Sequence, residues 1–361
     1  MRVLVAGTFP HLPGHLATGT VRAFEEIGHE VRLFDYLGFR DHAVWKLGNR
    51  ARLKFRPLGH VLYPPRRQGL LRAVDEFRPQ LLFVIGGEVF DARTIQRISR
   101  RGIRTALWIA DDPYQRGREI VAAPAFDLVY VFDPYYREAL RKRGVARPQY
   151  LPMACDPKVH RPIPLSQAER RELGGILCFV GTWYPNRDRL LREIRDLPLS
   201  IWGGGWPLAL ARRPLHPLAP HYRGRASGGE MVRIYSGHRA VLNIQHPQSK
   251  LAQNMRTFEG PACGALTLTE WTEELPNLFR EGEEIVSWRS VDELRGKLHH
   301  LLARPEKAQA IGARGRERAH QDHTYRCRMK RVLEDAGLAD AGRADAGRAG
   351  GRKEPARRTA A

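Results

Sequence analysis

The stretch NMRTFEGPACGALTLTE, from Asn254 to Glu270, has the pattern of a polar helix that ends at a glycine and passes directly into a strand. Arg256 and Glu259 stand about one helical turn apart just before this strand. Side chains three residues apart lie on the same face of a helix. The two residues therefore form either an ion pair on a solvated helix face or part of a ligand site where helix and strand meet.

The second half of the chain alternates strands and helices around this stretch. Continuous apolar runs predict strands at ILCFVGTW, LSIWGGGW and AVLNIQ. Strands that are apolar along their whole length are typical of parallel sheets covered on both faces. Helices are expected over 186–194, 229–236, 275–279 and 292–303, and over 305–333 with a break near His323.

The first half repeats this alternation, and a segment rich in proline and charge, CDPKVHRPIPLSQAERRELGG, connects the two halves. Its expected strands are RVLVAGTF, HEVRLFDY, PQLLFVIGG, RTALWIADDP and DLVYVFDP, whereas 38–65 has no clear period and is left unassigned. Alternating strands and helices imply right-handed crossovers and a parallel sheet. We therefore predict an α/β protein of two Rossmann-like domains, 1–160 and 161–335, that face each other across a cleft. A disordered basic tail of low complexity is expected over 336–361.

The chain is strongly basic, with a net charge of +21 over 361 residues, and only nine of its 60 basic residues are lysine. These residues are spread along the whole chain, whereas a nucleic-acid module more often gathers them in one stripe with interleaved aromatics. An arginine excess is also produced by the base composition of a genome. Attraction to an anionic ligand or membrane is the second interpretation, and no specific nucleic-acid partner is expected.

The four cysteines form no CxxC pair, which argues against a zinc or redox site. Cys178 and Cys263 lie in apolar runs and are expected to be buried thiols. The apolar run in MRVLVAGTF is too short for a signal peptide, and no stretch approaches 18 apolar residues. We therefore expect a cytoplasmic protein, with at most a peripheral contact at the inner membrane face.

Roughly 176–332 resembles the C-terminal domain of GT-B glycosyltransferases, and most closely that of the CgeB-like group. The blocks that carry this resemblance are FVGTW, NMRTFEGPACGALTLTE, LFREGEEIVSW, LARPEKAQAIGARGRERA and HTYRCRM. The first half resembles the N-terminal domain of that group more weakly, through LWIADDP and FDLVYVFD. The resemblance implies a hexosyltransferase-like enzyme that moves a sugar from a UDP-, GDP- or dTDP-linked donor to a glycan or lipid-linked acceptor in polysaccharide biosynthesis. It implies no cofactor and no metal.

In such enzymes the C-terminal domain holds the donor, and Glu259 matches a glutamate that accepts hydrogen bonds from the ribose hydroxyls. Ser249 is expected to cap the following helix, whose first amides would then face the diphosphate. Lys250 and Arg256 would neutralise that diphosphate as it leaves. Leu251 stands where many retaining enzymes carry a second glutamate, which weakens any expectation of a retaining outcome. Replacing Glu259 by alanine is expected to weaken donor binding and to leave the fold intact.

Two glycine-containing segments, FVGTWYPNRD and IWGGGW, follow strands of the second half. Glycine lets the backbone approach a ligand closely, and three glycines after a strand predict a tight turn. Thr182 is expected to hydrogen-bond a phosphate, and Arg187 either reaches the diphosphate or has a structural role at the start of the helix. The expected donor-binding residues are Gly181, Thr182, Arg187, Gly203, Gly204, Lys250, Asn254, Arg256 and Glu259.

Carboxylates follow several strands of the first half, where one of them can act as the general base on the attacking hydroxyl. Asp111 and Asp112 form a tandem after RTALWI, Glu88 follows PQLLFVIGG, and Asp133 ends VFD. An aspartate before a proline also commonly caps a helix, so one residue of the tandem is expected to be a cap and the other the base, with Asp112 as cap and Asp111 as base one of the two arrangements. His15 is expected either to act on the acceptor or to cap and pack at the start of the first helix.

Three rival functions stay open on the sequence. A non-catalytic protein of this fold would bind the nucleotide sugar without transfer, and an epimerase would form product without an acceptor. A nucleic-acid binder would lose affinity steeply as salt rises.

Overall fold

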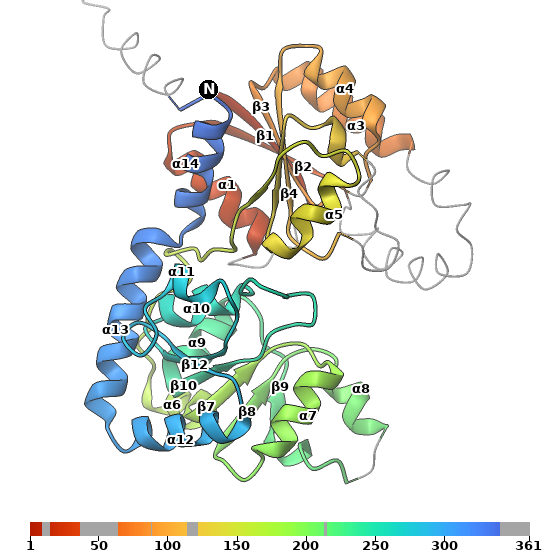
Figure 1. The fold of residues 1–361 in the computed structure, drawn as a ribbon. Helices are drawn as coiled ribbons and strands as arrows, with labels where there is room; N and C mark the ends of the chain where they lie inside the picture. The colour runs from red at the N-terminus through yellow and green to blue at the C-terminus, as the bar shows by residue number, and fades with distance from the viewer. Residues whose placement is uncertain (9–14, 37–63, 88, 114–121, 213–214, 340–361) are drawn as a thin grey trace, which may run out of the picture.

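The computed structural model describes residues 1–8, 15–36, 64–87, 89–113, 122–212 and 215–339 (Figure 1). It contains two parallel sheets of six strands each, one in each half of the chain, with helices packed against them. The prediction of two Rossmann-like α/β domains is therefore confirmed. The predicted tail from residue 340 onward and most of the unassigned segment 38–65 lie outside the described residues.

The first sheet has the order β2-β1-β3-β4-β5-β6, and β3, in its middle, is buried along its whole length. Its strands are β1 (Arg2–Gly7), β2 (Glu30–Asp35), β3 (Leu81–Ile85), β4 (Arg104–Ile109), β5 (Leu128–Val131) and β6 (Pro148–Tyr150). The helices of this half are α1 (Leu16–Glu26), α3 (Pro64–Phe77), α4 (Ala92–Ser99) and α5 (Arg137–Arg141), with short 3-10 turns at Ala123–Ala125 and Pro134–Tyr136.

The second sheet has the order β12-β11-β10-β7-β8-β9. Its strands are β7 (Gly175–Val180), β8 (Leu199–Trp202), β9 (Tyr222–Gly224), β10 (His238–Asn243), β11 (Leu266–Glu270) and β12 (Val286–Trp288). Its helices are α6 (Gln167–Leu173), α7 (Pro185–Glu193), α8 (Trp206–Ala211), α9 (Gly229–Gly237), α10 (Arg256–Ala262), α11 (Leu275–Leu278), α12 (Val291–Leu302) and α13 (Pro305–Asp322). The short elements α6, α8, β9 and β12 were not predicted, because a run of three to seven residues gives only a weak periodic signal.

The stretch 254–270 folds as a helix followed by a strand, as predicted, but α10 is not a polar surface helix. All six residues from Thr257 to Ala262 are buried. The helix ends before Gly264, whose φ of +75° is a backbone conformation that side chains disfavour. Cys178 and Cys263 are buried free thiols, as expected.

The last helix returns to the first domain. The expected break near His323 separates α13 from α14 (Tyr325–Asp335), which packs against α1 beside the first sheet (Figure 1). The hydroxyl of Tyr130 donates to Asp335 Oδ2 at 2.7 Å, and apolar residues of α14 join the core of the first domain. The domain limits at residues 160 and 335 stay predictions, and α14 belongs by packing to the first half.

Candidate functional site

The carboxyl ends of strands in the two sheets meet at the loop 244–255, which connects β10 to α10 and is called the β10–α10 loop below. Asp133, which follows β5, places its Oδ2 atom 2.7, 3.1 and 3.1 Å from the backbone nitrogens of residues 250, 251 and 252. Its Oδ1 atom accepts from the amide of Tyr135 at 2.9 Å. Asp133 is fully buried, so its carboxylate is a contact between the two halves and is not open to an acceptor.

Two further contacts join the same loop to the first domain. The hydroxyl of Tyr136 donates to the carbonyl of Gln248 at 2.7 Å, and the side-chain amide of Gln248 donates to Asp111 Oδ1 at 3.2 Å. Burial raises the pKa of Tyr136, as do the charges of Asp112 and Asp133. Tyr136 therefore stays protonated and able to donate. Asp111 is exposed and Asp112 is half-buried, so Asp111 is the more accessible of the tandem.

The expected helix cap at Ser249 is wrong. The helix α10 begins after Met255 without a side-chain cap, and the hydroxyl of Ser249 is buried with no hydrogen-bond partner among the described residues. The amides of 250–252, which precede the helix, are taken by a protein carboxylate. In this conformation they do not face a diphosphate. The side chain of Lys250 is exposed.

Arg256 and Glu259 form an ion pair that is not on a solvated helix face. Arg256 Nη1 contacts Glu259 Oε2, and the side chain of Glu259 is 1% exposed, whereas that of Arg256 is 31% exposed. Arg256 Nε also lies 3.4 Å from the carbonyl oxygen of Val180, at the end of β7. Burial alone lowers the pKa of Arg256, but the charge of Glu259 outweighs it and raises that pKa. Arg256 therefore stays protonated at the strand ends, with Glu259 as its counter-ion.

A histidine of the connecting segment lies behind this pair. His160 Nδ1 accepts from the amide of Asp156 at 3.0 Å, which leaves the ring proton on Nε2, 3.7 Å from Glu259 Oε1. Burial lowers the pKa of His160, so the ring is neutral near pH 7. Asp156 in turn pairs with Arg22 of α1. This histidine was not predicted from the sequence, because a single histidine between domains carries no local signal.

A buried network of amide side chains shapes the β10–α10 loop. Asn254 Nδ2 donates to Asn243 Oδ1 at 3.1 Å, and Asn254 Oδ1 accepts from the amide of Arg256 at 2.9 Å. Gln245 Oε1 accepts from the amide of Asn254 at 3.0 Å, and Gln245 Nε2 donates to Gln253 Oε1 at 2.6 Å. Both of the polar side-chain atoms of Asn254 thus have protein partners at the start of α10, and its contact with a donor stays a prediction.

Arg187 was expected either to reach the diphosphate or to have a structural role, and its contacts are structural. Its Nη1 donates to the carbonyl of Thr182 at 2.9 Å, and Nη2 and Nε donate to the carbonyl of Ile244 at 3.0 and 3.3 Å. The residue is 7% exposed, and burial lowers its pKa to about 10. Arg187 therefore joins the turn after β7 to the end of β10, where a buried guanidinium is satisfied by backbone carbonyls.

The glycines after β7 and β8 form the tight turn that was predicted. Gly203 has a φ of +137°, and a Cβ atom there would lie 2.2 Å from the carbonyl oxygen of Gly181. The amide of Trp183 donates to the carbonyl of Gly204 at 2.9 Å, so the two turns are bonded to each other. A Cβ on Gly204 would meet no described atom within 4 Å, and Thr182 is exposed. These two residues face open space beside the strand ends.

The remaining catalytic candidates are placed as follows. His15 is the N-cap of α1, with Nδ1 accepting from the amide of Ala17 at 3.3 Å, which is the capping role. Glu88 lies outside the described residues, as do residues 114–121, so the capping role of Asp112 stays a prediction. Glu270, at the end of β11, was missed, although it ends the stretch that opens the sequence analysis. Burial raises its pKa, and its Oε2 accepts from the amide of Gln245 at 3.1 Å.

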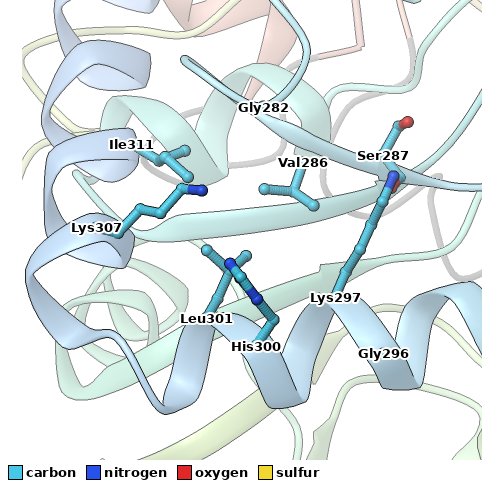
Figure 2. A pocket seen from close by; sticks show the side chains of 9 residues that line it. All are labelled: Gly282, Val286, Ser287, Gly296, Lys297, His300, Leu301, Lys307 and Ile311. Carbon is cyan, nitrogen blue, oxygen red and sulfur yellow. The ribbon is translucent and has the colours of Figure 1, made fainter.

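A separate pocket of about 360 Å³ lies between β12, α12 and α13, as Figure 2 shows. It contains none of the predicted site residues. Its polar lining is largely engaged: Lys297 pairs with Glu293 at 2.7 Å and donates to the carbonyl of Ser287 at 2.8 Å. Within the described residues no three His, Cys, Asp or Glu side chains gather as a metal site, and no helix is long and apolar enough to cross a membrane.

Comparison with solved structures identifies the arrangement of the two domains. Sucrose-phosphate synthase from Thermosynechococcus elongatus superposes with a TM-score of 0.63 at 14% identity, over 94% of this chain and 100% of that one. The catalytic domain of starch synthase IV from Arabidopsis thaliana, bound to ADP and acarbose, gives 0.65 at 10% identity, over 94% and 99%. The chain has the GT-B fold. Anabaena HepE in complex with UDP-glucose gives 0.64 at 12% identity, over 93% and 99%.

Sequence comparison adds a match in the second domain. Residues 187–334 match the model of a family described as glycosyl transferase-like, which supports glycosyl transfer in general terms. No curated protein matches the sequence. The matched segment contains the β10–α10 loop, Arg256 and Glu259, so the family likeness and the GT-B strand ends coincide at one place.

Proposed function

We propose that this GT-B protein is a metal-independent glycosyltransferase that moves a sugar from a nucleotide-sugar donor to a hydroxyl acceptor. The observation that carries the proposal is Arg256. Arg256 belongs to the matched segment, its guanidinium is held by the buried Glu259, its side chain is 31% exposed, and its Nε atom lies 3.4 Å from the carbonyl oxygen at the end of β7. A fixed cation at strand ends of an open α/β sheet suits the diphosphate that leaves during transfer.

The roles of the neighbouring residues follow from their placement. Glu259 holds Arg256 through Oε2 and its side chain is 1% exposed, so a direct contact between Glu259 and the ribose hydroxyls requires a change of conformation that exposes the carboxylate. Lys250 adds a second, exposed cation on the same loop, and Thr182 and Gly204 line the open side of the two turns. Lys250, Thr182 and Gly204 remain our candidates for residues that contact the diphosphate and the nucleoside.

Asp111 is our candidate for the general base. It is exposed, lies at the end of β4, and receives a hydrogen bond from Gln248 of the donor domain. That contact would place the base next to the donor when the two domains meet. The carboxylate would take the proton from the acceptor hydroxyl as the sugar leaves the diphosphate.

UDP is the first donor nucleotide to test, since HepE, a protein of the same fold, binds UDP-glucose. GDP and dTDP donors follow in the panel. As an acceptor we propose a glycan or lipid-linked hydroxyl, as in CgeB-like enzymes of polysaccharide biosynthesis, with the enzyme in the cytoplasm or at the inner membrane face. Activity is expected to survive EDTA, because Lys250 and Arg256 would neutralise the diphosphate in place of a metal.

A thermal-shift screen with UDP-, GDP-, dTDP- and CMP-sugars tests the proposal. A ligand at about 100 times its dissociation constant stabilises the folded protein by about 2.7 kcal/mol. Arg256→Gln should abolish most of the shift. The matched control is Arg239→Gln, which removes an exposed arginine at the opposite end of the same sheet, in β10. The proposal fails if no nucleotide sugar raises the melting temperature, or if both variants keep the full shift.

Product analysis with the nucleotide found in that screen separates the rival functions. Transfer requires both donor and acceptor. Product formed from the donor alone would indicate an epimerase, and binding with no product across an acceptor panel would indicate a non-catalytic protein.

A further inference from the structure

The carboxylate of Asp133 is surrounded by backbone N–H groups from both halves of the chain. Three come from residues 250–252 of the second domain, at 2.7, 3.1 and 3.1 Å, and one comes from Tyr135, at 2.9 Å. Asp133 has no exposed surface. The residues it joins are more than one hundred positions apart in sequence and follow strands of different sheets.

Successive amides that converge on one point form an anion-binding concavity of the kind that proteins use for phosphate. Here the anion is a side chain of the same molecule. Hydrogen bonds from amides to an ionised carboxylate are about twice as strong as neutral ones. An amide that loses such a partner while it remains buried is left as an unsatisfied donor, which destabilises the conformation that buries it. The conformation of 250–252 therefore depends on a charge supplied by the other domain.

We propose that Asp133 is an interdomain latch, whose carboxylate fills an anion site formed by the amides of 250–252 and thereby holds the β10–α10 loop against the first domain. The loop carries Lys250 and leads directly into Arg256, and its Gln248 contacts Asp111. The latch therefore fixes the distance between the donor cations and the proposed base. Asp133 is a positioning residue and touches no reacting atom.

Hydrogen exchange of the three amides measures the latch directly, with no need for a substrate. In Asp133→Gly, exchange at 250–252 should become at least about tenfold faster than in the wild type. Formate, which fits the space left by the missing carboxylate, should slow it again. Chloride at the same ionic strength should not. The matched control is Asp127→Asn, since Asp127 accepts from the amide of Thr105 at 2.8 Å entirely within the first domain.

Unchanged hydrogen exchange at 250–252 in Asp133→Gly overturns the proposal. Faster exchange that formate does not slow also overturns it. If hydrogen exchange in the glycine variant is faster throughout β10 and β11, the sheet as a whole is loosened, and Asp133→Asn is then measured in its place. This variant keeps the size of the side chain and loses its charge, and faster exchange confined to 250–252 supports the latch. Slow exchange there, equal to that of the wild type, refutes it.

The effect of the latch on turnover rests on the proposed function. Asp133→Gly should lower kcat with a smaller change in nucleotide affinity, and formate should restore kcat. If exchange responds to formate while no transfer is found in any variant, the latch stands and the proposed activity falls.

Discussion

Arg256→Ala and Glu259→Gln break the same ion pair, yet the structure predicts unequal losses of stability. The side chain of Arg256 is 31% exposed and that of Glu259 is 1% exposed. After Glu259→Gln, the arginine can turn toward water, so the loss should be about 1–2 kcal/mol, between the values for exposed and buried pairs. After Arg256→Ala, the carboxylate stays buried without its partner, for which a loss of about 3–5 kcal/mol is expected.

Melting temperatures provide the assay. For a domain of this size, about 1 kcal/mol shifts the melting temperature by about 2–4 °C, so the two variants, which differ by at least about 1 kcal/mol, should melt at least about 2 °C apart.

The double variant Arg256→Ala/Glu259→Gln completes a double-mutant cycle, which gives the interaction free energy between the two residues. Equal losses in the single variants, or a larger loss in Glu259→Gln, would refute this account of the site. The expectation that Glu259→Ala leaves the fold intact stays a prediction, but a loss of stability is now expected with it. A side chain with 1% exposure is part of the packed interior.

Two further predictions concern the proposed base and a buried histidine. Asp111→Asn should lower turnover by about 10²–10⁴-fold with nucleotide affinity nearly unchanged, and by more than Asp112→Asn, because Asp111 is the accessible carboxylate. Single-turnover kinetics measure this, and wild-type rates in both single variants and the double variant would remove the tandem from the mechanism. His323 donates from Nε2 to the carbonyl of Leu278 at 2.6 Å, and burial lowers its pKa from 6.5 to about 4. The unfolded state therefore binds the proton first, and this residue should reduce stability by about 3 kcal/mol as the pH falls from 6.5 to 4. Urea unfolding across this range should show a shallower fall in His323→Gln, and identical slopes in the two proteins would exclude the histidine as the cause.

Local sequence was sufficient for the architecture. Apolar runs such as QLLFVI and ILCFV predict buried strands whatever lies elsewhere in the chain, and the break near His323 and the glycine turn at Gly203 were also predictable. The short elements α6, α8, β9 and β12 were missed, since a run of three to seven residues gives only a weak periodic signal. Parallel strands also imply that functional side chains gather at their carboxyl ends, which is where Arg256 and Asp111 lie.

What each of those side chains does was decided only by packing between distant parts of the chain. Asp133 looked like one of several equivalent carboxylates after strands, but the fold places it on amides of residues 250–252. Arg187 looked able to bind a diphosphate, but it is bonded to backbone carbonyls. The physical reason is that periodicity and turn residues act over a few positions, whereas burial and hydrogen-bond partners depend on which surfaces the two domains bring together.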